Sequence, residues 1–352
     1  MDQILDLLAQ NSVDACLLTS PANIRYVTGF TGDDATALVS PHGKTLITDS
    51  RYEQQARDET MDTETEVHVI RAGQDRWMIL RDFFTEHPAA VLGIEEEALS
   101  VSEYRHVQSV AGSTDYADFS NILLQERAIK TEHEIACIQE AARATDRVME
   151  ALLDVIHPGM SEYEIRAELL YAIAREDMDL AFEPIVAAGP NGAMPHASVS
   201  QYRLRKGDFI TLDFGCRYLG YCADMTRTIA VGHVDDELKT IYDIVEKAQE
   251  AAENAAEVGV TARQVDEIAR TIIRDAGYAR YFGHGTGHGV GLQIHELPII
   301  NQSSDAILVD GMAFTIEPGI YVEGLGGVRI EDTCVAGIGS LFSFPKTLIE
   351  LH

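Results

Sequence analysis

The sequence predicts an α/β (α+β) protein with a small N-terminal α/β domain and a larger C-terminal domain that contains an internal repeat. Three observations lead to this prediction. Short apolar strand candidates alternate with helical stretches over residues 1–125, the pattern changes near Gln125–Lys130, and the remainder presents one series of helix caps, glycines and acids twice. The 352 residues, 46% of them hydrophobic, suffice for a sizeable core.

The N-terminal domain is expected to span residues 1–125. A helix-like stretch, Asp2–Gln10, comes first, and strands alternating with helical stretches follow, as in a small α/β domain. The clearest strand candidates are Ala15–Leu18, Ala37–Val39, Thr45–Thr48 and Val67–Ile70.

The second domain is expected to span residues 126–352. Thr131 and Glu134 form a capping box, from which an amphipathic helix runs to about Ile156. Two later helix starts resemble each other at a distance of about 100 residues: Gly159–Ser161 with Glu164, and Gly259–Thr261 with Gln264. Each is preceded by a longer helix, near 132–156 and 236–257.

Acidic residues follow the same repeat. Asp213 closes the apolar strand DFITLD, Glu317 closes MAFTIE, and a glycine precedes each acid by six residues. Each strand is followed by a turn and a second strand that delivers another acid, Asp224 or Glu331. We therefore expect a duplicated half-domain with a pseudo-twofold axis, in which each half contributes two carboxylates.

These four acids and His288 are candidate metal ligands. Together Asp213, Asp224, His288, Glu317 and Glu331 carry a formal charge of about −4. This charge matches two divalent cations, and the oxygen-rich donor set suits hard metals better than a structural zinc. The pattern favours two-metal activation of water for hydrolysis.

Histidines gather near the candidate ligands. His288 lies in the glycine-rich run HGTGHGVG, with His284 four residues before it and His295 seven after it. The glycines make a helical zinc pair improbable, because they disfavour a helix there. His196, in PNGAMPHAS, mirrors this segment in the first repeat, and Arg329, in GGVRIEDT, could pair with the ligand carboxylates or with substrate.

Composition excludes some classes of function. A net charge of −30 argues against non-specific nucleic-acid binding, because phosphate repulsion would dominate. No apolar run reaches the roughly 18 residues that span a membrane, and the acidic, amphipathic start is unlike a secretory signal, so we expect a cytoplasmic protein. The five scattered cysteines, without a CxxC pair, are expected to be buried and reduced.

The motifs together resemble those of the "pita-bread" metallopeptidases, and within them the proline-specific branch of aminopeptidase P and prolidase. The resemblance covers nearly the whole chain, and five matching segments occur in order: PNGAMPHA, LDFGCRYLGYCADMTRT, GHGTGHGVGLQIHE, TIEPGIY and GVRIEDT. The resemblance implies a pita-bread catalytic domain with a curved antiparallel sheet, behind a creatinase-like N-terminal domain. It also implies a homodimer.

The resemblance assigns a role to each candidate ligand. Asp213 would chelate one metal, Asp224 and Glu331 would bridge both, and His288 and Glu317 would hold the other. A hydroxide bridging the two metals would attack the scissile carbonyl. We expect Mn²⁺, with Co²⁺ and Zn²⁺ as alternatives, since the ion bound in a cell follows availability as well as affinity.

It also implies roles for neighbouring residues. Glu317 would assist as a base, and His284 and His295 would line the substrate subsites and stabilise the tetrahedral intermediate. His196 would belong to the same inner ring, and Arg329 would orient the bridging carboxylates. Histidines can move protons near neutral pH, which suits these roles.

The resemblance leaves the specificity open between two peptidases. The runs YVTGFTGDDATALVS and LITDSRY resemble aminopeptidase P more closely, so we expect an Xaa-Pro aminopeptidase acting on peptides with proline in the second position. The alternative is an Xaa-Pro dipeptidase (prolidase). Creatinase-like amidinohydrolases do not keep the five ligands, and an inactive binding module or a methionine aminopeptidase fits the motifs less well.

Overall fold

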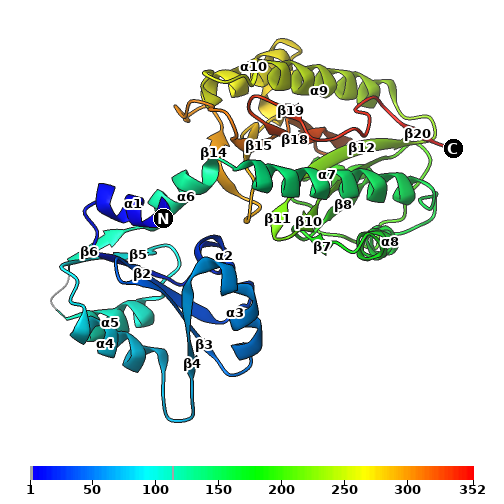
Figure 1. Cartoon of the computed structure of the whole chain (residues 1–352). Coiled ribbons are helices and arrows are strands. Elements are labelled where there is room, and N and C mark those ends of the chain that lie inside the picture. Colours follow the sequence, from blue (N-terminus) through cyan, green and yellow to red (C-terminus); the bar gives the residue numbers. More distant parts are fainter. Residues whose placement is uncertain (1–2, 113–114) are drawn as a thin grey trace. The chain divides into compact units, whose positions relative to one another are not determined.

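The computed structural model describes residues 3–112 and 115–352, and the chain divides into two compact units, residues 1–126 and 127–352 (Figure 1). Asp2, where the first helix was expected to begin, lies outside the described residues. Among the helices in the described ranges, none has the length and apolar character needed to cross a membrane.

The first unit contains a six-stranded mixed sheet in the order β4-β3-β2-β1-β5-β6. Three of its neighbouring pairs are parallel and two are antiparallel. Each of the expected strands forms. The elements are α1 (Gln3–Gln10), β1 (Ala15–Leu18), α2 (Pro21–Thr28), β2 (Ala35–Ser40), β3 (Gly43–Asp49), α3 (Glu53–Glu59), η1 (Met61–Thr63), β4 (Thr65–Ile70), α4 (Arg76–Glu86), β5 (Val91–Ile94), α5 (Val101–Ala111), β6 (Asp115–Asp118) and α6 (Ser120–Ala128).

Helices cover both faces of this sheet. Alternate residues of a strand point to opposite faces, so β1 sends Cys16 and Leu18 to one side and Ala15 and Leu17 to the other. The first side packs against α1, α2, α3 and α6, and the second against α4 and α5. The first unit is therefore an α/β domain, as the sequence predicts, and its helices form two layers around the sheet.

Two long helices and two shorter ones form the helical layer of the second unit: α7 (Glu132–Leu153), α8 (Glu162–Arg175), α9 (Asp236–Ala255) and α10 (Ala262–Asp275). The expected capping boxes are present at Thr131, Ser161 and Thr261. Helix α7 ends at Leu153, three residues before the predicted Ile156. Its C-cap residue, Asp154, precedes a turn that leads into the second helix start.

The sheet of the second unit is antiparallel along the path β14-β13-β15-β18-β12-β9-β8. Strands β19 and β20 pair with β18 and β12 respectively. The path consists of β8 (Ile185–Ala188), β9 (Phe209–Phe214), β12 (Met225–Val231), β13 (Gly287–Gly289), β14 (Glu296–Ile300), β15 (Ala313–Ile316) and β18 (Glu331–Val335); the two side strands are β19 (Gly339–Ser340) and β20 (Glu350–Leu351).

Five short strands of smaller sheets and two 3-10 helices, labelled η, lie outside this sheet. They are β7 (Asp179–Leu180), η2 (Gly189–Ala193), β10 (Cys216–Tyr218), β11 (Tyr221–Cys222), η3 (Ala279–Tyr281), β16 (Gly319–Val322) and β17 (Gly326–Arg329). The β10–β11 hairpin connects β9 to β12, and the β16–β17 hairpin connects β15 to β18.

Both halves of the second unit begin with a longer and a shorter helix and end with two sheet strands joined by a hairpin: β9 and β12 in the first half, β15 and β18 in the second. Gly159 and Gly259, both with positive φ, each donate a backbone hydrogen bond of 2.8 Å, to Leu204 and Leu308 respectively. One hydrophobic cluster joins α7 and α8 to β8, β9 and β12, and a second joins α9 and α10 to β14 and β15. The halves meet where β12 pairs with β18 (Figure 1).

Residues 343–346, near the C-terminus, contact elements of both halves. Asp146 of α7 accepts hydrogen bonds from Ser343 N, Ser343 Oγ and Phe344 N, and the Arg227 guanidinium of β12 donates to two carbonyls of the same segment. Lys346 forms ion pairs with Glu253 of α9 and Asp332 of β18. The C-terminal segment is thus held by residues of both halves. The five cysteines are buried and free, as expected.

Candidate metal centre

The four candidate acids lie at corresponding places in the two halves. Asp213 is near the end of β9 and Glu317 follows β15, while Asp224 precedes β12 and Glu331 begins β18. Ile210, Leu212 and Phe214 of β9 enter the hydrophobic core, so the intervening Asp213 projects from the opposite face. Proline after Glu317 disfavours a helical backbone there, in keeping with its extended approach.

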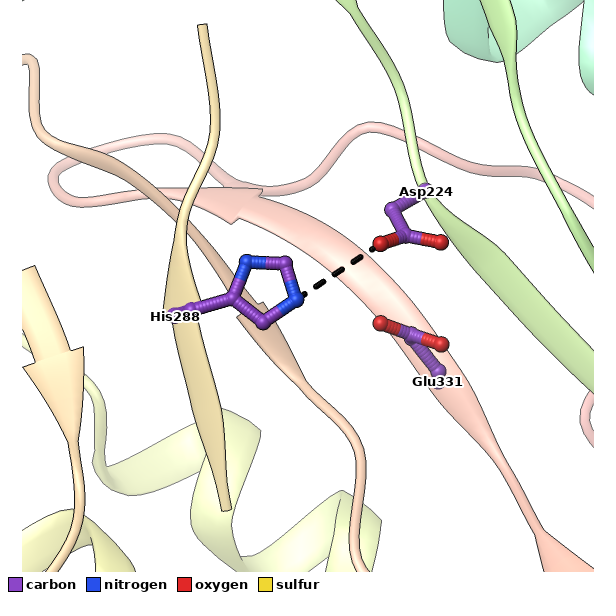
Figure 2. A group of neighbouring side chains, drawn as sticks. All are labelled: Asp224, His288 and Glu331. Carbon is purple, nitrogen blue, oxygen red and sulfur yellow. Dashed lines mark ion pairs between the residues drawn. The ribbon is translucent and has the colours of Figure 1, made fainter. Parts of the chain in front are cut away.

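Three of the five candidate ligands come together closely. Asp224, His288 and Glu331 each offer one ligand atom, and these atoms lie within 4.8 Å of one another (Figure 2). Glu317 lies outside this group, but its Oε1 is 3.3 Å from Nε2 of His288. Asp213 is also outside it, and its Oδ2 accepts a 2.5 Å hydrogen bond from Arg329.

The carboxylates of this cluster are suited to bind cations. Among the described residues, Asp213 Oδ1, Asp224 Oδ1 and Glu331 Oε1 are buried and have no hydrogen-bond partner. Burial, followed by repulsion from neighbouring carboxylates, raises the pKa values of Asp224 and Glu331 well above their usual range. Buried acceptor atoms without partners destabilise a fold, and divalent cations would satisfy them. The donor set therefore fits a carboxylate-rich metal site.

The orientation of His288 agrees with this fit. Its Nδ1 donates to the carbonyl oxygen of Gly289 at 3.1 Å, which leaves the Nε2 lone pair facing Asp224 and Glu317. Burial lowers the pKa of His288, so the neutral imidazole is favoured. A neutral ring whose second nitrogen is bonded to a carbonyl is the usual state of a metal-ligating histidine.

A chain of hydrogen bonds connects the cluster to His284. Arg329 donates to the Tyr321 hydroxyl at 2.9 Å, and this hydroxyl lies 2.9 Å from Nε2 of His284. Because Nδ1 of His284 donates to the carbonyl of Gly285, Nε2 is the acceptor and Tyr321 the donor. Burial raises the pKa of Tyr321 to about 12, so the phenol keeps the proton that it donates.

Buried carboxylates anchor two of the histidine-bearing loops. Glu162 accepts from Ala188 N at 2.7 Å and Ser200 N at 2.7 Å, on either side of His196. Asp266 accepts from Thr286 N and Oγ1, and Arg270, paired with Asp266, donates to the carbonyl of His284. The loops that carry His196 and His284 are thereby attached to α8 and α10.

A third buried carboxylate fixes the loop of His295. Glu296 accepts from Arg127, from Lys130 at 3.1 Å and from Gln293 N at 3.0 Å. The ring of His295 meets that of His288 edge to face, with centroids 4.4 Å apart. Burial of the ring lowers the pKa of His295.

All nine sequence-predicted site residues line a single cavity of about 570 Å³. Apolar side chains form much of the remaining wall. The predicted residues are His196, Asp213, Asp224, His284, His288, His295, Glu317, Arg329 and Glu331, and the apolar ones include Phe182, Pro184, Ile185, Val199, Ile294 and Ile299.

The sequence interpretation missed two polar residues beside the cluster. Thr226 contacts both Glu331 and Arg329, and Tyr321 joins Arg329 to His284. Both belong to motifs singled out from the sequence, ADMTRT and TIEPGIY. Thr226 lies two residues after Asp224, and residues two apart in a strand point to the same face. This spacing is the one signal in the sequence that could have placed Thr226 beside the metal ligands.

Comparisons with known proteins agree with this geometry. Residues 136–337 match the model of metallopeptidase family M24, and residues 1–129 match that of the creatinase/prolidase N-terminal domain. The chain is 34% identical to the Xaa-Pro dipeptidase of Pyrococcus furiosus, over 100% of this chain and 99% of that protein.

Solved structures with similar folds include peptidases of two specificities. The structure is similar to the Xaa-Pro dipeptidase of Bacillus anthracis (38% identity, TM-score 0.93, covering 98% of this chain and 97% of that one). It is also similar to the X-Pro aminopeptidase of Thermotoga maritima (36% identity, TM-score 0.90, covering 98% and 99%). The expected resemblance is confirmed: this chain belongs to metallopeptidase family M24, with a creatinase/prolidase N-terminal domain preceding the peptidase domain.

Proposed function

We propose that the protein hydrolyses the N-terminal Xaa-Pro bond of peptides with two divalent ions held by Asp213, Asp224, His288, Glu317 and Glu331. The observation that supports this most directly is the set of buried carboxylate oxygens without partners, which face one cavity beside His288. Bound ions would supply an activated water and stabilise negative charge on the scissile carbonyl. Mn²⁺ is the proposed ion, with Co²⁺ and Zn²⁺ as alternatives.

The surrounding residues would hold the substrate and move protons. In this proposal Glu317 acts as a base. Arg329, which was expected to orient the bridging carboxylates, pairs directly with Asp213 instead and reaches Glu331 only through the Thr226 hydroxyl. Burial lowers the pKa of His284 and of His295, which favours neutral rings that can exchange protons near neutral pH. His196 lies in the same cavity wall, on the loop anchored by Glu162.

The cavity wall supports a longer peptide as the substrate. A dipeptide presents a free carboxylate next to its proline, and recognition of this group calls for a cation. Of the described residues that line the cavity, Arg329 is the one arginine or lysine, and it already contacts Asp213, Thr226 and Tyr321. We therefore propose an Xaa-Pro aminopeptidase, whose substrates have an uncharged peptide group at that position.

The second candidate is an Xaa-Pro dipeptidase. The names of the Pyrococcus furiosus and Bacillus anthracis proteins favour it, because both are described as Xaa-Pro dipeptidases. The two candidates share the proposed metal centre. They differ in the group that follows the substrate's proline, which is a free carboxylate for a dipeptidase and a further peptide group for an aminopeptidase.

A direct assay separates the candidates. The protein, loaded with Mn²⁺, is incubated with Ala-Pro and with Ala-Pro-Ala, and free alanine is measured over time. We expect kcat/KM for the tripeptide to exceed that for the dipeptide by about 10-fold or more, which equals about 1.4 kcal/mol of transition-state binding. Cleavage of the dipeptide alone would reject the aminopeptidase and favour the dipeptidase. Cleavage of neither would contradict the proposed function.

A further inference from the structure

Thr226 lies between two acids of the proposed metal centre. In the sheet register it is the partner of Asp213 on β9 and also of Glu331 on β18. Residues directly opposite one another in antiparallel strands project from the same face. Asp213, Thr226 and Glu331 therefore form one row across three strands, and the row crosses the junction of the two halves.

The hydrogen bonds along this row have a fixed direction. Nε of Arg329 lies 3.1 Å from Oγ1 of Thr226, and a guanidinium can only donate. The threonine hydroxyl must then use its own hydrogen elsewhere, and Glu331 Oε2 lies 2.5 Å away. Thr226 thus accepts from Arg329 and donates to Glu331.

This arrangement leaves one oxygen of each acid available. Thr226 donates a hydrogen bond to Oε2 of Glu331, and Arg329 donates one to Oδ2 of Asp213. The other two oxygens, Glu331 Oε1 and Asp213 Oδ1, are buried without a hydrogen-bond partner. Figure 2 shows the Glu331 carboxylate beside Asp224 and facing His288, so the orientation of Glu331 determines where a cation could be bound.

The repeat supplies a reciprocal contact. Thr333, two residues after Glu331, accepts from the Asp224 backbone N–H at 3.0 Å and donates to the Asp224 carbonyl at 2.9 Å. Thr226, two residues after Asp224, holds Glu331. Both threonines are fully buried. Each half therefore positions an acid of the other half through a hydroxyl group.

We propose that Thr226 is a positioning residue of the metal centre, whose hydroxyl turns the Glu331 carboxylate so that Oε1 faces the bound ions. This inference rests on the metal centre of the proposed function. Without the hydroxyl, Glu331 Oε2 and Arg329 Nε lose their shared partner inside the protein. Residues that hydrogen-bond to metal ligands typically change metal affinity by about 10- to 100-fold when they are substituted.

The test measures Mn²⁺ binding in the absence of substrate, by competition with a chromophoric chelator. Thr226→Val keeps the shape of the side chain and removes the hydroxyl, and we expect its Mn²⁺ affinity to fall by about 10- to 100-fold. Thr226→Ser restores the hydroxyl and should bind Mn²⁺ within about threefold of the wild type. Thr211→Val is the matched control, because Thr211 is buried on the adjacent strand and its hydroxyl pairs with Thr228.

The outcomes are distinguishable. Unchanged affinity in Thr226→Val, or an equal loss in Thr226→Ser or Thr211→Val, would overturn the role of the Thr226 hydroxyl while leaving the proposed function intact. A wild-type protein that binds no Mn²⁺, Co²⁺ or Zn²⁺ would overturn the metal centre itself. If Thr226→Val does not fold, Thr226→Cys provides the same comparison, since a thiol donates only weakly.

Discussion

Nε2 of His288 lies 3.7 Å from Oδ2 of Asp224, and the two residues come from different halves of the duplicated domain. We expect Asp224→Asn to abolish peptidase activity, because an amide is a much weaker ligand for a divalent ion than a carboxylate. Assays of activity and circular dichroism on the same preparation check this. Wild-type turnover by the variant would contradict a role for Asp224 in metal binding.

The Asp224→Asn protein should remain folded. Burial and neighbouring carboxylates raise the pKa of Asp224, so the ionised group costs stability in the metal-free protein. Asp224→Asn removes that charge, and the melting temperature of the metal-free variant should equal or exceed that of the metal-free wild type. A lower value, measured in excess chelator, would show that Asp224 stabilises the fold directly.

The Tyr321 hydroxyl links Arg329 to His284. Tyr321→Phe removes this link and keeps the ring, so we predict a fall in kcat of about 10- to 100-fold with little change in melting temperature. Tyr242→Phe is the control, because Tyr242 is buried outside the cavity and donates to the carbonyl of Lys346. Equal kcat values for the two variants would show that the Tyr321 hydroxyl has no role in catalysis.

The buried His284 should make the stability of the metal-free protein depend on pH. Desolvation lowers the pKa of His284 below the 6.5 that is usual for a histidine in water, so the unfolded chain binds a proton more readily than the folded one. The contribution of the neutral His284 ring to the free energy of unfolding is therefore present above pH 6.5 and is lost as the pH falls below that value. Urea unfolding at pH 7.5 and pH 5.5 should show a larger decrease for the wild type than for His284→Gln. An identical decrease would mean that His284 is accessible to protons in the folded state.

Asp146 should contribute strongly to stability. Its carboxylate accepts three hydrogen bonds from Ser343 and Phe344, which attach the C-terminal segment to α7. We predict that Asp146→Ala lowers the free energy of unfolding by about 3 kcal/mol, since a hydrogen bond to a charged group contributes roughly 1.5–3 kcal/mol. Glu150→Ala, at an exposed position of the same helix, should have little effect. Urea titration compares them, and equal changes would argue against the anchoring role.

Local patterns in the sequence were sufficient for much of this fold. Capping boxes identified the starts of α7, α8 and α10, because a cap is formed by residues three positions apart. Short apolar runs identified β1 and β9, and the repeated acids indicated equivalent strands in the two halves. Each cap, apolar run and acid is recognised within a short segment, and the repeat only requires two such segments to be compared, which is why one sequence can reveal them.

Contacts between distant segments could not be predicted in this way. Thr226 meets Glu331 across 105 positions, and Glu296 meets Lys130 across 166. Neither threonine nor a lone glutamate has a pattern that identifies such a partner, because the contact depends on strand register and packing. The β10–β11 hairpin, expected as a simple turn between Asp213 and Asp224, also joins β7 in a separate small sheet.

The dependence of Xaa-Pro cleavage on bound metal tests the proposed two-metal centre. The protein is dialysed against a chelator, Mn²⁺ is added back stepwise, and both the bound metal per chain and the release of alanine from Ala-Pro-Ala are measured. If two bound ions activate the water, the metal-free protein should have negligible activity, and full activity should return as about two ions bind per chain. Undiminished cleavage by the metal-free protein, or metal binding without any Xaa-Pro cleavage, would contradict it.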